Sequence, residues 1–507
     1  MKNIAVFIFI SLLISCNSDF LSLYPENQSN EGNFFKTENH FTQALNGAYT
    51  SLRDISAQQG FLMGEMRSDN THYTRYKPDR GIHILYRENI ADFIGDDQNQ
   101  WVGYMWTGCY TGISRTNTII DRISKSDLSD NFKNEILGQA HFLRAFYYFQ
   151  LAQCFGGVPL QLSEVTDAST AFPGAKKSID EVYSAIIDDV TDAIEKLPVV
   201  SFPQNGKANK GAAKMLYAYV LMTKPNPDQS LAETQLKDIL KMGYELLPNY
   251  ADVFDPNNKY SKEHIFSVQH LQGDQGQQSM YLYWFIPKSS EAKVITGLDA
   301  SNTLLTGGWN VPTPAMIDSY EKDDKRLNPS IAIAVGDLDG DAMTIEKVLE
   351  VNDPEIEDFE IARPFVNKYN HPHAKLQNTD DNWPIYRYSD ALLLLSECLV
   401  NQGKSNEALP YINQVRKRAG LPNLSNVTAQ DVAKERKHEL AFENHRWYDL
   451  LRTGEALNVM TDYAKYIKTF DPELPDRTYQ IKKEYLLYPI PYRELQINKE
   501  LVQNPGY

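Results

Sequence analysis

The amino-acid sequence predicts a mainly α-helical fold, in which tetratricopeptide-like helical hairpins form a scaffold that carries long irregular loops and a few short strands. Two observations support this prediction. Apolar residues recur at three- and four-residue steps in three pairs of segments, near residues 132–197, 210–242 and 386–419. Residues 244–384 are instead rich in proline, glycine, aspartate and aromatic residues. Paired helices cannot bury their apolar faces alone, so we expect the pairs to stack into one continuous body.

The boundaries of the hairpin helices follow from capping residues. The first helix is expected to stop at Gly156, and its partner to begin at Ser178, which can form a capping box with Glu181. The third pair has about the length of one 34-residue tetratricopeptide unit. Pro410 inside its second helix is expected to kink that helix.

An acidic segment near the C-terminus has charges that need partners elsewhere in the chain. Residues 434–451 predict one helix, on which Glu435, Glu439 and Glu443 share a face and repel one another. Cations from neighbouring helices should therefore pack against this face. The alternative is that two of these carboxylates are the acid and base of a glycosidase. We favour an ion-pair network, because glutamates on adjacent turns point along one surface and do not converge on a substrate.

The N-terminus has the layout of a secretory signal peptide over residues 1–15. Lys2 precedes an apolar run, residues 4–14, that is too short to span a bilayer. The sequence Leu-Ile-Ser-Cys that ends at Cys16 resembles a bacterial lipobox. That resemblance implies cleavage before Cys16, lipid attachment to its thiol and anchoring to a membrane.

Composition and motifs exclude several classes of function. A formal charge of −16 argues against nucleic-acid binding. Cys109, Cys154 and Cys398 have no metal or redox spacing and are expected to be buried free thiols. A nucleophile elbow, Walker loop, HExxH motif or dinucleotide fingerprint does not occur in the sequence. The sequence therefore predicts a protein that is not an enzyme and has no catalytic residues and no cofactor.

Two short motifs imitate metal sites. His371 and His373 lie in a turn-like segment without nearby cysteine, which favours a surface loop over a metal site. Residues 337–341 resemble the start of an EF-hand loop, but Ala342 replaces the required glycine and Val348 the required glutamate. We expect an acidic turn and no metal site.

Aromatic rings in irregular segments are the candidate ligand-binding residues. A sugar ring can stack on an aromatic plane while its hydroxyl groups bond to polar side chains, so such rings with polar neighbours suit glycans. The candidate rings are Tyr73, Trp101 and Tyr104 in the early loop and Tyr283, Trp284 and Trp309 in the late stretch. The candidate polar partners are Asp69, Asn70 and Arg75. Trp106, on a helical stripe, and Trp383, beside a proline, are assigned to packing.

Four segments resemble, in order, signatures of the SusD-like (RagB/SusD) family of outer-membrane nutrient-binding lipoproteins. They are GQAHFLRAFYYFQLAQCFGGVPL (138–160), RYSDALLLLSECLVNQGKSNEAL (387–409), ERKHELAFENHRWYDLLRTGEA (435–456) and YPIPYRELQINKELVQNPGY (488–507). The resemblance implies a single SusD-like domain over residues 16–507. Its members build their ligand face from corresponding early and late loops.

The resemblance also implies a function. The expected protein is a lipid-anchored, surface-exposed outer-membrane protein that captures an oligosaccharide and passes it to a SusC-like TonB-dependent transporter. Three alternatives stay open: a peptide-binding RagB-type protein, an all-helical glycosidase that uses Glu439, and an assembly scaffold that binds no small ligand.

Overall fold

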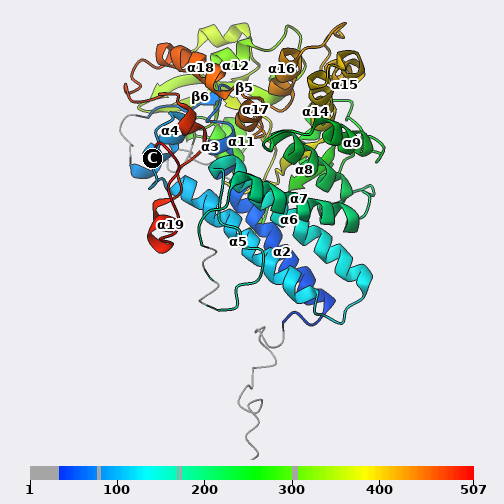
Figure 1. Ribbon diagram of the computed structural model, residues 1–507. Helices are drawn as coiled ribbons and strands as arrows, with labels where there is room; N and C mark the ends of the chain where they lie inside the picture. Colours follow the sequence, from blue (N-terminus) through cyan, green and yellow to red (C-terminus); the bar gives the residue numbers. More distant parts are fainter. Residues whose placement is uncertain (1–33, 57, 77–80, 168–170, 172–173, 300–306) are drawn as a thin grey trace, which may run out of the picture.

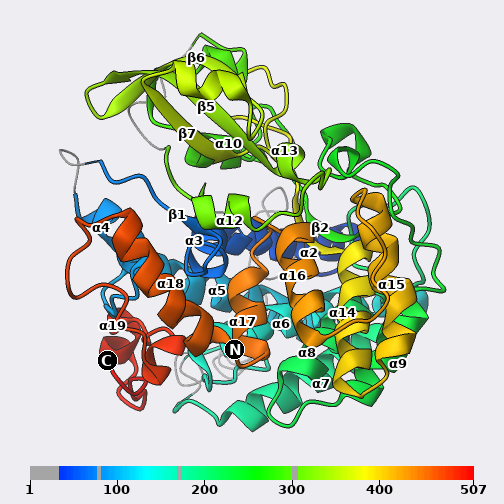
Figure 2. The ribbon, with the colours of Figure 1, turned by 90° about the horizontal axis from the view of Figure 1, so that it is seen from above.

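The computed structural model describes residues 34–56, 58–76, 81–167, 171, 174–299 and 307–507. Long helices form the body of the molecule (Figure 1), and a small β-sheet projects from one side of it (Figure 2). The mainly α fold with few strands is thereby confirmed. The predicted signal peptide and Cys16 lie outside the described residues.

Helical hairpins occupy the three periodic segments. They are α6 (Asp130–Phe155) with α7 (Ile179–Lys196), α8 (Lys210–Thr223) with α9 (Gln229–Ile239), and α14 (Tyr388–Asn401) with α15 (Ser405–Arg418). Ser178 and Glu181 form the predicted capping box of α7. Gly156 ends α6 with φ 73°, a conformation that favours glycine. The helix α15 is assigned as one continuous helix across Pro410.

Two N-terminal helices cover the first hairpin. The helices α2 (Glu38–Ser56) and α5 (Gln100–Ile123) lie along α6 (Figure 1). Gly112 of α5 permits this close approach, because a Cβ atom there would lie 2.3 Å from the ring of Tyr147. The Tyr147 hydroxyl donates to the carbonyl of Ala48 at 2.7 Å, which ties α6 to α2. Trp106 is buried in the same core, as predicted.

The acidic segment forms two helices, so the prediction of one helix over residues 434–451 was wrong. The helix α16 (Ala429–Glu439) ends early, and α17 (Arg446–Arg452) follows after a turn. Phe442 and Asn444 have φ of 65° and 67°, which a helix does not allow. The backbone N–H groups of both residues donate to the carboxylate of Glu65, each at 3.1 Å. A buried acceptor far away in the sequence therefore stabilises the break.

The predicted ion-pair network around Glu435, Glu439 and Glu443 is confirmed. Glu435 pairs with Arg326 and Arg416. Glu439 pairs with Arg326, Arg387 and Arg418. Glu443 pairs with Arg387 and Lys368. Burial alone would raise the pKa of Glu439, but Arg418, Arg387 and Arg326 outweigh burial and hold it well below its ordinary value. Glu439 is ionised and fully enclosed, so it cannot protonate a bound glycan.

Except for β1, the assigned strands lie in the segment before α14 or at its border. Residues 244–384 contribute β3 (Ser289–Glu291), β5 (Ile331–Asp339), β6 (Ala342–Leu349) and β7 (Ile361–Val366), in the spatial order β3-β6-β5-β7. This sheet is the lobe that projects from the helical body in Figure 2. The EF-hand-like residues 337–341 form the end of β5 and the acidic turn into β6, where Asp339 pairs with Ala342. Two-stranded pairs join β1 (Thr71–His72) to β4 (Val311–Pro312) and β2 (His264–Val268) to β8 (Trp383–Arg387).

Shorter elements complete the molecule. They are α3 (Gln58–Gly64), α4 (Ile82–Ala91), α10 (Tyr281–Phe285), α11 (Lys293–Thr296), α12 (Pro314–Asp318), α13 (Leu327–Ser330), α18 (Ala456–Phe470), α19 (Tyr492–Ile497) and the 3-10 turns η2 (Ala251–Val253), η3 (Pro256–Asn258), η4 (Pro354–Asp358) and η5 (Lys483–Leu486). The helix α19 begins directly after Pro491. Cys109, Cys154 and Cys398 are buried free thiols, as predicted. Across the residues with assigned structure, no helix has both the length and the apolar composition required to cross a bilayer.

Candidate functional site

A cleft of about 700 Å³ brings together segments that are far apart in the sequence. Its walls are the end of α2, the start of α3, the outer face of α5 and residues 270–284. We call it the aromatic cleft, because Trp101, Tyr104 and Trp284 line it. Its volume lies within the roughly 300–1,000 Å³ range of small-molecule sites. Trp101 and Tyr104 lie in the first turns of α5 and not in an irregular loop, so that part of the prediction was wrong. The structure nevertheless brings them together with Trp284 of the late stretch.

The first turn of α5 positions two of these rings. Asn99 caps the helix by accepting from the backbone N–H of Trp101 at 3.0 Å. Trp101 and Tyr104 lie three residues apart and therefore on one face of the helix. Their rings meet edge to face, with centroids 5.6 Å apart. Tyr104 is 48% exposed, and Trp101 and Trp284 are half-buried, so all three rings offer surface to a ligand.

Arg87 of α4 holds the aromatic wall from behind. Its guanidinium carbon lies 4.8 Å from the ring centroids of Trp101 and Trp284 and 5.0 Å from that of Trp309. With the amide of Gln58 oriented so that its oxygen faces Arg87, this oxygen accepts from Nε at 2.7 Å and from Nη2 at 3.0 Å. Burial lowers the pKa of Arg87 to about 10, so the group stays cationic at neutral pH. One cation thus orients rings from both halves of the site.

Trp309 supports the wall from inside the protein. It is 4% exposed, and its backbone N–H donates to the carbonyl of Trp284 at 3.0 Å. The ring of Tyr73 lies 6.0 Å from its ring. Trp309 therefore packs behind Arg87 and has almost no surface for a ligand.

The other predicted residues make contacts away from the aromatic cleft. Asp69 pairs with Arg446 at 2.7 Å and with Lys437 at 2.9 Å. Asn70 donates to Glu65 at 2.7 Å, Tyr73 donates to Asp92 at 2.9 Å, and Arg75 pairs with Asp471 at 3.1 Å. Tyr283 is fully buried and its hydroxyl lies 2.6 Å from Nε2 of His373.

The polar groups of the cleft come from residues that their sequence context does not mark as ligand contacts. Arg53 and Asp54 at the end of α2, together with His270 and Gln278, line the cleft. Nε2 of His270 lies 2.8 Å from the hydroxyl of Tyr281. Oε1 of Gln278 is buried and has no hydrogen-bond partner within the described structure. Burial lowers the pKa of His270 to about 4, which keeps this imidazole neutral.

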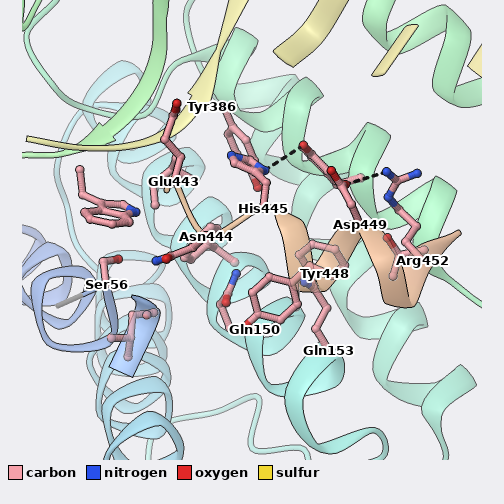
Figure 3. A pocket seen from close by; sticks show the side chains of 18 of the residues that line it. Ser56, Gln150, Gln153, Tyr386, Glu443, Asn444, His445, Tyr448, Asp449 and Arg452 are labelled. Carbon is pink, nitrogen blue, oxygen red and sulfur yellow. Dashed lines mark hydrogen bonds and ion pairs between the residues drawn. The ribbon is translucent and has the colours of Figure 1, made fainter. Parts of the chain in front are cut away.

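Two other cavities differ from the aromatic cleft in size or chemistry. Figure 3 shows side chains that line a cavity of about 80 Å³, among them Gln150 and Gln153 of α6 and Asn444, which lies beside Ser56. This volume is well below that of a typical ligand site. A groove of about 640 Å³ runs along α16 and α17, where ion-paired side chains such as Arg436 and Arg452 line it. Among the described residues, no tyrosine, tryptophan or phenylalanine lines this groove.

The two histidines that were assigned to a surface loop make contacts within the protein. Nδ1 of His371 pairs with Asp381 at 2.5 Å, and Nδ1 of His373 lies 2.8 Å from the carbonyl of His371. No group of three metal-ligating side chains occurs among the residues whose positions are described.

Comparison with known proteins gives the same assignment for both ends of the chain. The family model described as "SusD family" matches residues 360–507. A second, "Starch-binding associating with outer membrane", matches residues 19–221. Together the two matched regions contain all four segments that carry the resemblance.

Individual proteins resemble the chain along its whole length. "SusD-like protein P2" of Formosa agariphila is 28% identical over 535 aligned positions, which cover 100% of both chains. The structure of "Surface glycan-binding protein A from Bacteroides fluxus" is 26% identical, with a TM-score of 0.75 over 93% of this chain and 100% of that chain. A "Laminarin binding SusD-like protein" shares the fold at 24% identity, with a TM-score of 0.74 over 93% and 100%. The chain belongs to the SusD-like family.

Proposed function

We propose that this protein captures oligosaccharides at the cell surface in the aromatic cleft and delivers them to a SusC-like TonB-dependent transporter. The observation that carries the proposal is the meeting of Trp101, Tyr104 and Trp284 in one open cleft of about 700 Å³. The names of similar proteins, which refer to laminarin binding and surface glycan binding, support a carbohydrate ligand.

The chemistry of the cleft suits a sugar. The three rings offer flat apolar surface to the C–H face of a pyranose, and burial of that surface stabilises the complex by roughly 25 cal/mol per Å². Arg53 and Gln278 line the cleft and can exchange hydrogen bonds with ligand hydroxyl groups.

The proposed role is binding without catalysis. A glycosidase places two carboxyl groups on opposite sides of the scissile bond, about 5–10 Å apart. Asp54 is the only carboxylate among the described residues that line the aromatic cleft. This supports capture of an intact ligand.

The lipid anchor and the transporter complete the proposal. The lipobox resemblance assigns the anchor to Cys16, and the family resemblance assigns the outer membrane and the transporter partner. A neighbouring open reading frame that encodes a TonB-dependent barrel is expected. Its absence from the genomic neighbourhood would count against the delivery step but not against glycan binding.

Isothermal titration tests the ligand class. The mature chain, with Cys16→Ser to prevent lipidation, is titrated with neutral glycan oligosaccharides and with a peptide library in parallel. Saturable binding to a glycan is expected. Binding to peptides alone would contradict the proposal and favour a peptide-binding member of the family.

A further inference from the structure

The outer face of α5 joins the aromatic cleft to a second groove. This groove has a volume of about 530 Å³ and lies between α5, residues 159–165 and the C-terminal helix α19. Thr107 and Thr111 line both cavities. Both threonines are exposed, so the two cavities meet on the solvent-facing side of one helix.

The junction is a low ridge along that helix. Tyr104, Thr107, Thr111 and Ser114 follow three- and four-residue steps and are all exposed. The three ridge side chains beyond Tyr104 are small. Residues 104–114 extend about 15 Å along the helix axis at 1.5 Å per residue. A ligand on this ridge would therefore be longer than one sugar ring.

The second groove has a surface that suits the same kind of ligand. Val165 and Ile497 are 41% and 46% exposed and line it. Gln161 and Asn498 place amide groups beside them. The hydroxyl of Tyr110 donates to the carbonyl of Pro159 at 2.8 Å, which fixes the wall formed by residues 159–165 to α5. Apolar patches bordered by amides can take both the C–H faces and the hydroxyl groups of a sugar chain.

We propose that a bound glycan chain continues from the aromatic cleft across Thr107 and Thr111 into this second groove, so that the protein binds an extended segment of polysaccharide. The inference rests on the proposed function of the aromatic cleft. Continuity between the two cavities identifies the occupant, because a chain bound in the cleft reaches the groove without leaving α5.

Chain length is the variable that tests the inference. The mature chain is titrated with trisaccharides and decasaccharides prepared from laminarin, xyloglucan and starch. For a glycan that binds, the decasaccharide is expected to bind about tenfold or more tightly than the trisaccharide. Ile497→Arg and Val165→Arg place a long charged side chain in the second groove only. Each should abolish most of this length advantage and leave the trisaccharide affinity unchanged. Leu338→Arg, at an exposed apolar position of the sheet lobe, is the matched control and should keep the advantage.

The outcomes separate the two proposals. Equal affinity for both lengths in the unmodified protein would overturn the extended path and leave the aromatic cleft intact. A length advantage that survives Ile497→Arg and Val165→Arg would also overturn it, because the added sugars would then bind elsewhere. Failure of every trisaccharide and decasaccharide to bind would overturn the proposed function itself.

Discussion

Replacement of Arg87 tests whether one buried cation organises the aromatic cleft. In Arg87→Met the three cation–π contacts disappear. Such a contact is worth about 0.5–1 kcal/mol at an exposed site and about 2 kcal/mol when desolvated, so for this buried group the three sum to a few kcal/mol. The two hydrogen bonds to Gln58 are lost as well. The variant also gains stability, because it no longer buries a charge. Burial lowers the pKa of Arg87 to about 10, which corresponds to a cost of about 3 kcal/mol for the charged form. These terms nearly cancel, so the free energy of unfolding should change by only about 1 kcal/mol.

The free energy of ligand binding contains no opposing term of this kind. Without the guanidinium, Trp101 and Trp284 lose their shared contact and can adopt other rotamers, so binding must order them again at about 0.5–1.5 kcal/mol per side chain. We expect Arg87→Met to weaken glycan affinity about tenfold, measured by isothermal titration. Arg87→Lys should recover part of this loss, because it keeps the cation. A folded Arg87→Met variant with unchanged affinity would refute the reasoning.

Three further predictions concern residues outside the aromatic wall. Asp69→Asn leaves Lys437 and Arg446 without their carboxylate partner and should lower the free energy of unfolding in urea by about 3–5 kcal/mol. The same variant should not change the glycan dissociation constant, and a large loss of affinity would return Asp69 to the site. Burial raises the pKa of Asp92 to about 8. The folded state therefore holds a proton that the unfolded chain has lost above about pH 4. The contribution of this proton to the free energy of unfolding falls as pH rises from about 4 through 8. Asp92→Asn should therefore flatten the pH dependence of urea unfolding between about pH 5 and 8, and an unchanged slope would contradict this assignment.

Local patterns in the sequence were sufficient for the scaffold. The capping box at Ser178 and the glycine after α6 depend on residues within one or two turns of each other. The repulsion among three stacked glutamates is equally local, and it is enough to predict that cations pack against them. The break between α16 and α17 was not predictable in this way, because Glu65 lies far from it in the sequence.

The candidate site was predicted by region but not by residue. Trp101, Tyr104 and Trp284 stay a prediction as ligand contacts, and the structure places them together in the aromatic cleft. Tyr283 and Trp284 are neighbours in the sequence, yet Tyr283 faces the interior and Trp284 the cleft. An aromatic residue in an irregular segment has no periodicity that shows which way it points. The polar groups at the end of α2 were missed because they sit on a helix that looked purely structural.

The most direct test of glycan capture in the aromatic cleft is a titration of the double variant Trp101→Ala, Trp284→Ala. Removal of both rings should weaken binding of the preferred oligosaccharide about a hundredfold or more, or about 2.7 kcal/mol. Phe470→Ala is the matched control, because Phe470 is 53% exposed on α18 and lines none of the cavities described above. The account predicts a large loss in the double variant and none in the control. Unchanged affinity in a folded double variant would contradict it.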